Sequence, residues 1–293
     1  MTMNDNNEIL TEIPPIHNSI DGIFVRNGYK KNFDFPIHRH SEYELNLLIN
    51  ADNSRRIIGD SISKVGGMEM VLLGPNLTHG WKKGECRNNN VYEITLQFVP
   101  EVFVDDYLIR FQLMNLHDLL HRSANGVAFG RRSILKFFKD IELLAEMDSG
   151  LERLLHLVSL FHKLSDQNDY TQIASPAFTC IPPTMSSRRI TKVCRYINEH
   201  YSEPLKISVL GALINMTDSS FSRFFKIHTG TTPTEYITDI RLGAAARLLI
   251  TNPFQPILEI CYSCGFNNVS HFSRIFKQVK GMSPSEFRTQ YLS

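Results

Sequence analysis

The sequence predicts an α+β protein with two parts: a β-rich region followed by helices, and a C-terminal part made only of helices. Three observations lead to this prediction. Short apolar or alternating runs fill residues 37–98, the apolar period becomes helical from about residue 107, and one helical stretch near the C-terminus occurs twice, 51 residues apart. A chain of 293 residues is long enough for two domains with sizeable cores.

The β-rich region, at about residues 20–100, is predicted to be an antiparallel sandwich or barrel. Gly, Asn and Pro break it into short runs at Ile37–Ile49, Ser54–Ile58, Met68–Leu73 and Val91–Phe98. A helical segment follows at about residues 105–165. Its helices are marked by Leu113, Leu116, Leu119 and Leu120 and by the amphipathic stretches Ile134–Met147 and Leu151–Leu164.

We therefore place the first domain at residues 1–165. Residues 166–187 are polar, contain Pro176, Pro182 and Pro183, and show no clean period, so we predict an interdomain linker there. The second domain then covers residues 188–293.

The second domain carries the repeat. The repeated residues are Phe221, Ser222, Arg223, Phe225, Lys226, Gly230, Pro233 and Glu235, which recur as Phe272, Ser273, Arg274, Phe276, Lys277, Gly281, Pro284 and Glu286. On a helical wheel each copy places an apolar stripe opposite a polar face. The stripes are Phe221, Phe224 and Phe225, and Phe272, Ile275, Phe276 and Val279. The polar faces, which lack carboxylates, are Ser219, Ser222, Arg223 and Lys226, and Ser270, Ser273, Arg274 and Lys277.

Each copy is predicted to end at a glycine C-cap, Gly230 or Gly281, and to be followed by a capping box with Pro at the first helical position. A short apolar helix and a tight turn precede each copy, at Ile207–Ile214 and at Pro256–Cys264. Helix, tight turn and exposed polar helix make up the helix-turn-helix pattern. The stretch Tyr236–Ile250 is predicted to be one helix that joins the two units.

Charge separates the two parts of the chain. Residues 176–293 hold 13 Lys and Arg against 7 Asp and Glu, a net charge of +6, whereas residues 1–175 have a net charge of −5. A basic module favours phosphates through counterion release. Two rigidly linked helices could enter successive major grooves of DNA, about 34 Å apart. Double-stranded DNA is therefore the expected partner.

The stretch Arg188–Tyr291 resembles the DNA-binding domain of AraC/XylS-type bacterial transcription regulators. The likeness lies in the Phe-Ser-Arg-x-Phe-Lys cores at 221–226 and 272–277, in Gly230-x-x-Pro233-x-x-Tyr236, Arg241-Leu242, Ala246-x-x-Leu249 and Gly265-Phe266-Asn267, and in Gly281-x-Ser283-Pro284-x-x-Phe287-Arg288. An unrelated helical bundle with a chance repeat is the alternative, and it leaves these ordered matches unexplained.

With DNA as partner, the two recognition helices, residues 218–228 and 268–279, are expected in successive major grooves. Arg223 and Arg274 are the strongest candidates for base contacts, because an Arg bidentate to guanine discriminates best. The other candidate base contacts are Ser219, Ser222, Ser270 and Ser273, with His271 at the edge. Lys226 and Lys277 are expected to contact phosphates.

Between residues 38 and 79 the sequence carries a candidate pocket. His38, His40 and Glu44 share parity, so on an unbroken strand their side chains would lie on one face. With His79 they would suit a divalent transition metal. Residues Ile23–Phe98 resemble a cupin barrel, which AraC-type regulators often carry as an effector sensor. The resemblance implies a small-molecule effector bound by His38, His40, Glu44, His79 and Trp81.

The chain departs from the metal-binding cupin pattern. Residues 50–53 are Asn-Ala-Asp-Asn where a Gly usually closes the strand, and Gly74-Pro75 replaces the usual Pro-x-Gly order. We therefore expect no cofactor and no resident metal, although any metal that did bind would use His38, His40, Glu44 and His79. Otherwise the histidines form hydrogen bonds or contact the effector. Trp81, the only Trp, either stacks on a ligand ring or packs in the core.

The predicted function is a ligand-responsive, sequence-specific DNA-binding transcription regulator that is not an enzyme. A metal-dependent cupin dioxygenase or isomerase with a helical appendage is the alternative, and a purely architectural DNA binder is a third option. The helical pair within residues 134–164 either packs on the barrel or, as the resemblance implies, forms a homodimer contact. RNA polymerase is a further candidate partner.

The apolar content of the chain and its cysteines indicate where in the cell the protein is found. The start of the chain is polar and no run of about 18 apolar residues occurs, so we expect no membrane contact and a cytoplasmic location. Five scattered cysteines fit reduced thiols. Cys261-x-x-Cys264 lies in a predicted helix without a second ligand pair, which favours buried packing over a zinc or redox site.

Overall fold

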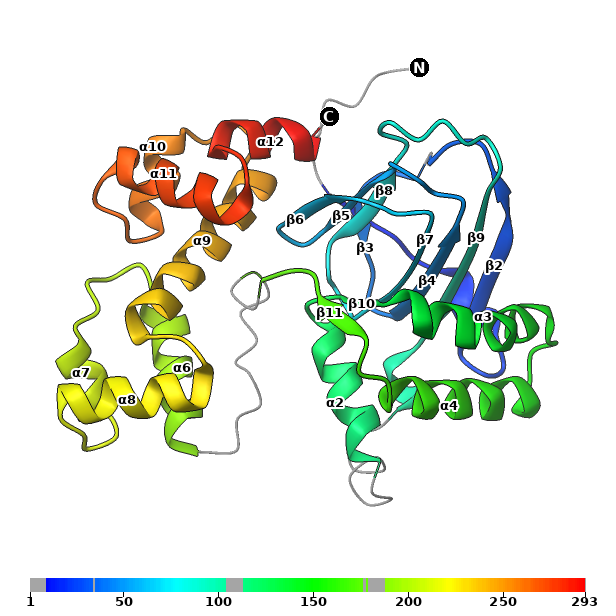
Figure 1. Ribbon diagram of the computed structural model, residues 1–293, viewed down its shortest axis with the longest axis horizontal. Helices are drawn as coiled ribbons and strands as arrows, with labels where there is room; N and C mark the ends of the chain where they lie inside the picture. Colours follow the sequence, from blue (N-terminus) through cyan, green and yellow to red (C-terminus); the bar gives the residue numbers. More distant parts are fainter. Residues whose placement is uncertain (1–8, 34, 104–112, 176–177, 179–187, 293) are drawn as a thin grey trace. The chain divides into compact units, whose positions relative to one another are not determined.

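The computed structural model describes residues 9–33, 35–103, 113–175, 178 and 188–292. They form two compact units, Ile9–Ala174 and the part from Ser175 onward (Figure 1). The predicted α+β class is confirmed, because two β-sheets lie in the first unit and the second is helical. Several predicted regions lie outside the described residues: 1–8, 105–112, 176–177, 179–187 and 293.

The N-terminal unit is built from two sheets. The six-stranded sheet has the order β11 (Tyr170–Gln172), β10 (Val127–Phe129), β7 (Met68–Leu73), β4 (Tyr43–Ile49), β9 (Val91–Phe98) and β2 (Ile23–Lys30). The five-stranded sheet has the order β1 (Leu10–Thr11), β3 (His38–Arg39), β8 (His79–Lys82), β5 (Arg55–Ile58) and β6 (Ser61–Lys64). Two short 3-10 helices complete the sheet region, η1 (Pro15–Asn18) and η2 (Pro100–Val102).

Alternation along the central strands separates two interiors. On β4, Leu45 and Leu47 belong to an apolar core shared with the helices α2 (Met114–Ser123), α3 (Arg131–Glu146) and α4 (Leu151–Ser165). Glu44 and Asn46 point the other way, toward the space between the two sheets. The helices therefore cover one face of the six-stranded sheet, and its opposite face carries buried polar groups.

The predicted strand at 37–49 is wrong in one respect, because it is broken. His38 lies on β3 in the five-stranded sheet, and Glu44 lies on β4 in the six-stranded sheet. The chain changes sheets at residues 40–42. Shared parity on one strand thus does not explain why these side chains meet.

The N-terminal unit also extends past the predicted boundary at residue 165, to Ala174. Strand β11 pairs antiparallel with β10, which in turn pairs with β7, and this adds both strands to the six-stranded sheet. The first part of the predicted linker is therefore sheet. A strand of three residues is too short to leave a recognisable period in the sequence.

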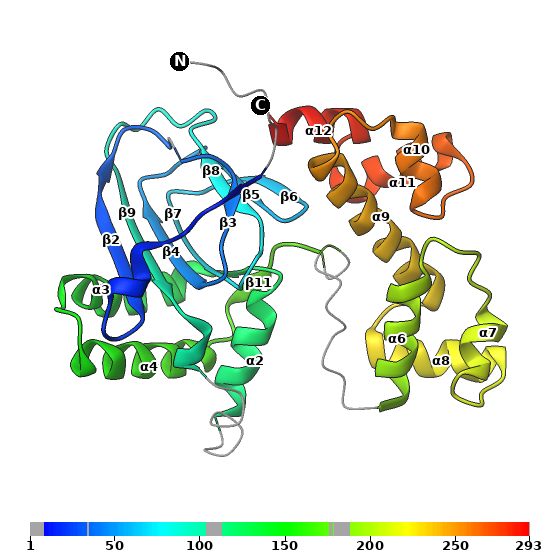
Figure 2. The same ribbon diagram turned by 180° about the vertical axis from the view of Figure 1, so that it is seen from behind.

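The C-terminal unit contains the predicted pair of helix-turn-helix units. The first consists of α7 (Ile207–Ala212) and α8 (Asp218–Thr229), and the second of α10 (Ile257–Ser263) and α11 (Val269–Lys280). Helices α6 (Arg188–His200), α9 (Pro233–Thr251) and α12 (Pro284–Leu292) complete the unit. Figures 1 and 2 show α9 running from one helix-turn-helix unit to the other.

Helix α9 connects the two helix-turn-helix units through two sets of buried residues. Near its start, Tyr236, Ile237 and Ile240 pack in one core with Phe221 and Phe225 of α8. Farther along, the buried residues of α9 are Leu242, Gly243, Ala244, Ala245, Ala246, Leu249 and Ile250. A single helix buried at both ends fixes the separation of the two units. None of the helices in the described residues combines the length and hydropathy needed to span a bilayer.

Candidate functional site

The repeated motif forms helices α8 and α11, close to the predicted bounds. Each begins after an N-cap in extended conformation, Thr217 or Asn268. Each ends at a glycine in the left-handed region, Gly230 at φ 79° and Gly281 at φ 76°. A side chain at either position would strain the backbone, so the predicted glycine C-caps have a direct physical cause.

The predicted capping boxes are present at the starts of α9 and α12. Thr232 N donates to Glu235 Oε2 at 2.8 Å, and Ser283 N donates to Glu286 Oε2 at 2.7 Å. In return the N3 backbone amides donate to the hydroxyls, at 3.3 Å in both boxes. These bonds lower the pKa of both glutamates. The helix that follows each repeat, α9 or α12, therefore begins with the same pattern of capping hydrogen bonds.

The two recognition helices, α8 and α11, bury aromatic rings and expose polar side chains. The rings of Phe221, Phe225, Phe272 and Phe276 are 0% exposed. The predicted DNA-binding side chains that lie exposed are Ser219, Arg223, Lys226, Ser270, His271, Arg274 and Lys277, and those that lie half-buried are Ser222 and Ser273. The structure thus brings the predicted residues to the surface of two equivalent helices.

The predicted apolar stripes are partly wrong. Phe224 and Ile275 are only half-buried, and Val279 is 51% exposed. Val279 belongs to the last turn of α11, just before the C-cap, where the predicted stripe runs past the packed part of the helix. The buried stripe of each helix is therefore narrower than the helical wheel indicates.

The two recognition helices differ in their internal bonds. At the start of α11 the Asn268 side chain accepts from His271 N at 2.8 Å, and His271 Nδ1 lies 3.5 Å from Arg274 Nη2. At the start of α8 the Thr217 side chain makes no cap bond. Arg223 has no hydrogen bond or ion pair with any residue that the structure describes. Both guanidinium groups therefore keep donors available for a ligand.

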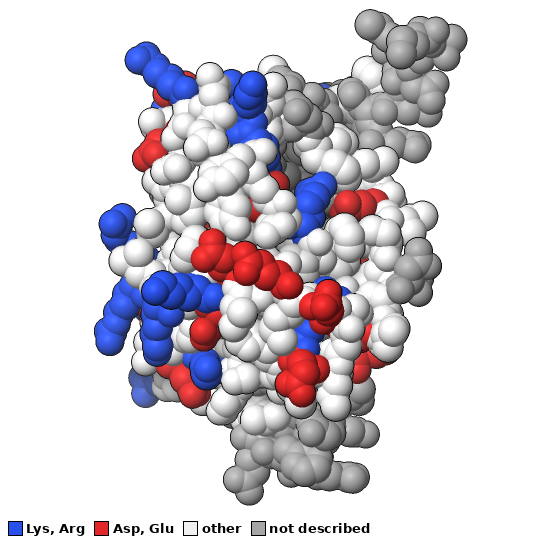
Figure 3. All heavy atoms as spheres, turned by 90° about the vertical axis from the view of Figure 1, so that its right-hand side faces the viewer, with Lys and Arg blue, Asp and Glu red and all other residues white. Residues whose placement is uncertain are grey.

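The surface of the N-terminal unit has a different character. On the face drawn in Figure 3, acidic and basic side chains lie interspersed. The exposed side chains that line α8 and α11 include Arg and Lys but no carboxylate after Asp218. A surface that must approach phosphates benefits from one sign of charge, and the recognition helices meet this condition.

The Cys261 and Cys264 pair lies in the core of the second helix-turn-helix unit. Both side chains are 0% exposed. Burial raises the pKa of both thiols, that of Cys264 to about 11. The metal-type cluster found within the described ranges contains neither cysteine. These observations favour packing.

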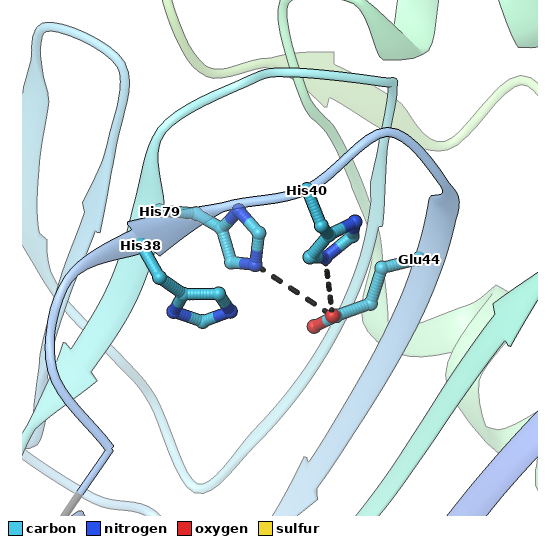
Figure 4. A group of neighbouring side chains, drawn as sticks. All are labelled: His38, His40, Glu44 and His79. Carbon is cyan, nitrogen blue, oxygen red and sulfur yellow. Dashed lines mark hydrogen bonds and ion pairs between the residues drawn. The ribbon is translucent and has the colours of Figure 1, made fainter. Parts of the chain in front are cut away.

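The predicted pocket residues of the N-terminal unit do meet. His38, His40, Glu44 and His79 are all buried, and one ligand atom from each lies within 4.8 Å of the others (Figure 4). His40 Nε2 is 3.0 Å and His79 Nε2 is 3.6 Å from Glu44 Oε2. His38 pairs across the strands with His79, with ring centroids 4.2 Å apart. Side chains from β3, β4 and β8 thus converge on one point.

Backbone carbonyls fix the tautomers of the three histidines. The Nδ1 atoms of His38, His40 and His79 lie 2.9, 3.1 and 2.7 Å from the carbonyl oxygens of residues 36, 42 and 77. A carbonyl oxygen only accepts, so each Nδ1 carries the proton. The Nε2 atoms therefore point inward. His40 Nε2 donates to Glu44 Oε2, because an ionised carboxylate only accepts, and His79 Nε2 is a buried atom without a hydrogen-bond partner.

Charge within the cluster is unevenly shared. Burial and the neighbouring His79 lower the pKa of His38 to about 4. Burial alone would also lower the pKa of His40, but the hydrogen bond and charge of Glu44 outweigh it and raise this pKa. Burial alone would raise the pKa of Glu44, yet His79 and His40 hold it well below its usual value. The carboxylate therefore stays ionised.

A divalent transition metal fits this donor set. Metal-bound histidines almost always donate their second ring N–H to a carbonyl or carboxylate, as all three do here. With bonds of about 2.1 Å, ligands on opposite sides of an ion lie about 4 Å apart, close to the 4.8 Å span of the four donors. The cluster could therefore close around an ion with small movements.

Trp81 lines the same pocket and is held in place. Its Nε1 donates to Glu69 Oε1 at 2.8 Å, and Arg56 Nη1 lies 2.6 Å from Glu69 Oε2. The ring is 6% exposed. Trp81 is thus packed in the core and also borders the cavity, so both of its predicted roles, core packing and stacking on a ligand ring, agree with its position.

Several pocket residues were not predicted from the sequence. Glu12 Oε2 lies 3.4 Å from His38 Nε2, and Gln97 Nε2 donates to both Glu12 and Glu44 at 3.0 Å. Asn46 and Thr95 lie on the same face of the six-stranded sheet. A signal was present in the alternation of polar Glu93, Thr95 and Gln97 with apolar residues along β9.

Comparisons with known proteins fit this geometry. Residues 210–290 match the helix-turn-helix domain family. YisR of Bacillus subtilis, described as an HTH-type transcriptional regulator, is 33% identical over 239 residues, 76% of this chain and 78% of the relative. The HTH-type transcriptional activator RhaS of Escherichia fergusonii is 23% identical over 267 residues, 87% of each chain. The C-terminal domain of AraT, a response regulator from Geobacillus stearothermophilus, is 30% identical and covers 36% of this chain and 86% of that one, with a TM-score of 0.34.

Proposed function

The chain belongs to the AraC/XylS family of bacterial transcription regulators, which makes it a DNA-binding regulator and not an enzyme, and from this premise we propose how its two units divide the work. The unit Ile9–Ala174 is the effector-sensing domain, and the unit from Ser175 onward is the DNA-binding domain. Effector binding in the first changes how a pair of the second units sits on DNA. The observation that carries the proposal is the repeated, carboxylate-poor polar face on two helices joined by α9.

On DNA, helices α8 and α11 enter successive major grooves, about 34 Å apart on one face of the duplex. Arg223 and Arg274 contact bases, because both are exposed and keep donors free. The serines of the two faces and His271 make the remaining base contacts. Lys226 and Lys277, one turn farther along, contact phosphates.

The effector enters the pocket between the two sheets, whose lining includes His38, Glu44 and Trp81. His40 and His79 complete the buried cluster behind these residues. A concave site with a few buried, oriented polar groups is the usual form of a small-molecule site. The pocket is the part of the N-terminal unit that best meets this description.

A second role of the same cluster is metal binding. It is favoured by the three inward-facing Nε2 atoms, of which His79 Nε2 has no hydrogen-bond partner. His38, His40, Glu44 and His79 would hold the ion, which would supply a Lewis-acidic anchor for an oxygen atom of the effector. The protein would then sense its effector through a metal without catalysing a reaction.

The helical pair α3 and α4 is the proposed homodimer contact. Leu135, Leu143, Leu151 and Leu155 are 59, 52, 68 and 54% exposed, an apolar surface that a second copy would cover. Leu151→Glu combined with Leu155→Glu should convert a dimer to a monomer in analytical ultracentrifugation. A wild-type monomer would remove this part of the proposal. A regulator of this type acts on chromosomal DNA in the cytoplasm, with RNA polymerase as a candidate partner.

The DNA-binding part is tested by selecting bound sequences from a random DNA library with the purified full-length protein. We expect a site with two conserved segments about one helical turn apart. Arg223→Ala should relax one segment and Arg274→Ala the other. A base-preference profile unchanged by both substitutions together would defeat the assignment.

The metal is tested by elemental analysis of protein purified without chelators. Stoichiometric iron, manganese or zinc that is lost in His79→Gln but kept in His162→Gln, an exposed histidine of α4, would establish the site. Protein that carries no metal and binds none added in solution would reject it and leave the effector pocket proposal intact.

A further inference from the structure

The pocket between the two sheets holds buried acceptor atoms that nothing in the described chain satisfies. Asn46 Oδ1 and Gln97 Oε1 are buried without a hydrogen-bond partner, and both side chains are 2% exposed. Burying a polar atom without a partner costs free energy. Two such atoms in one cavity therefore indicate that a ligand or ordered water completes them.

Carboxylates fix the orientation of both amides. Asn46 Nδ2 donates to Glu93 Oε1 at 3.3 Å and to Thr95 Oγ1 at 3.1 Å. Gln97 Nε2 donates to the carboxylates of Glu12 and Glu44 at 3.0 Å. A carboxylate only accepts, so the NH₂ groups must face the glutamates and the oxygens must face away from them. The pocket thus presents two preset acceptors, which select a ligand with hydrogen-bond donors.

Arg26 provides a positive charge at the side of the same pocket. Arg26 lies directly across from Thr95 on the neighbouring strand, and Thr95 lies across from Asn46, so the three share one face of the sheet. The guanidinium of Arg26 has no hydrogen bond or ion pair with a described residue. Lys30, the other cation of the lining, is already engaged with Glu93 at 2.6 Å. Arg26 is therefore the lining cation available to an anion.

Aromatic rings border the available cation. Phe33 and Phe35 belong to the lining, and the Arg26 guanidinium carbon lies 6.0 Å from the Phe35 ring centroid. The cavity itself has a volume of about 40 Å³, below the range of whole small-molecule sites. It is adjoined by a more open hollow of about 380 Å³ that shares Arg26, Lys30, Phe35 and Glu93 with its lining. A compact molecule would lie in this hollow and reach into the cavity.

We infer that the effector is a small hydroxylated carboxylic acid, with its carboxylate on Arg26 and its hydroxyl groups donating to Asn46 Oδ1 and Gln97 Oε1. This inference rests on the proposed effector pocket and assigns its chemistry. The bidentate fork of an arginine matches a carboxylate in geometry as well as charge. The two amide oxygens distinguish a hydroxy acid from a plain one, because an acid without donors leaves them unsatisfied.

The experiment measures thermal unfolding of the full chain through the fluorescence of Trp81, the only Trp. The probes form matched sets. Galacturonate is compared with galactose, gluconate with sorbitol, and mandelate with both phenylacetate and mandelamide. We expect a hydroxylated acid to raise the unfolding temperature by a few degrees at millimolar concentration. Its neutral counterpart and the acid without hydroxyl should have much smaller effects.

Variants assign the interaction to the residues. Arg26→Gln should weaken binding of the active acid about ten- to a hundredfold. Arg39→Gln, which removes an exposed arginine of the same unit, should leave binding unchanged. Asn46→Ser should reduce the advantage of the hydroxylated acid over the plain acid. Without ligand, all three variants should unfold cooperatively in the Trp81 signal, as the wild type does, which shows that the N-terminal unit folds.

The outcomes separate this inference from the proposal beneath it. Neutral polyols that stabilise the protein as well as the acids, with no loss in Arg26→Gln, would overturn the acid assignment and keep the effector pocket. Plain acids that act as strongly as hydroxylated ones would overturn the role of the amide oxygens. If no probe of any class binds, the hydroxy-acid assignment fails, while the effector pocket proposal and the DNA-binding results stand.

Discussion

The two units of this protein hold their functional side chains in opposite ways. In the N-terminal unit, His40, Glu44 and Gln97 are 2% exposed and tied to neighbours by hydrogen bonds. In the C-terminal unit, Arg223 and Arg274 are exposed and nearly without partners. A small ligand must be met by groups already placed in an interior. DNA is a large ligand that approaches from outside, so the side chains that contact its bases need only be exposed on rigid helices.

The largest expected effect concerns the buried charge that holds the N-terminal unit together. The Asp21 side chain is 1% exposed and pairs with Arg153 Nε at 2.7 Å and Nη2 at 2.8 Å, which links the start of β2 to α4. Asp21→Asn should lower the free energy of unfolding of this unit by about 3 kcal/mol, because the Arg153 charge stays buried without its partner. Urea unfolding followed by Trp81 fluorescence measures it.

The matched control is Asp140→Asn in the same unit. Asp140 is paired with Lys163 at 3.8 Å, and the two side chains are 38% and 54% exposed. Its loss should cost less than about 0.5 kcal/mol. Equal costs for the two substitutions would show that burial does not distinguish the ion pairs, and the contrast between the units would lose its energetic basis.

Substitution of the exposed arginines of the recognition helices should change DNA binding and leave stability unchanged. Arg223→Ala and Arg274→Ala should each weaken binding to the preferred DNA by about 1–3 kcal/mol and leave the unfolding seen by Trp81 unchanged. Lys226→Ala should weaken binding evenly across sequences and reduce the salt dependence by about one counterion. Titrations by fluorescence anisotropy at several salt concentrations measure both, with Arg131→Ala in the N-terminal unit as control. An arginine variant that weakens all sequences equally would mark a phosphate contact instead.

The recognition helices could be predicted from the sequence because their signals are local. Gly230, Gly281 and the two capping boxes act within one turn, and the 51-residue repeat confirms each signal by a second copy. The pocket depends on contacts between distant strands. The residues His38, Glu44 and His79 were identifiable, but their meeting through a break at 40–42 was not. Glu12 arrives from a strand of two residues, which has no period to detect.

A pH series sharpens the comparison further. Burial alone would raise the pKa of Asp21, but hydrogen bonds from Arg153, Ser19, Gly150 and Ser149 hold it well below its usual value. The stabilisation by this carboxylate is therefore complete above about pH 4 and is lost as the pH falls. The stability difference between wild type and Asp21→Asn should shrink by about 1 kcal/mol between pH 7 and pH 3. A difference that stays constant over this range would show that the pKa of Asp21 is not depressed.

Effects of similar size are expected at the capping boxes, which compare the two repeats with each other. Thr232→Ala and Ser283→Ala should each cost about 1 kcal/mol, and nearly equally, because the bonds they remove have the same lengths. Thr238→Ala, in the interior of α9, should cost less than about 0.5 kcal/mol. Helix content by circular dichroism follows the unfolding. A large difference between the two boxes would show that the repeats are not equivalent in energy.

The measurement that most directly tests the central claim is methylation interference at guanine N7 in a selected binding site, with purified full-length protein. We predict two clusters of interference in the major groove, about 10 bp apart on one face of the duplex. The cluster due to α8 should vanish in Arg223→Ala, and the cluster due to α11 should vanish in Arg274→Ala. A single cluster, or two that persist in the double variant, would contradict the account.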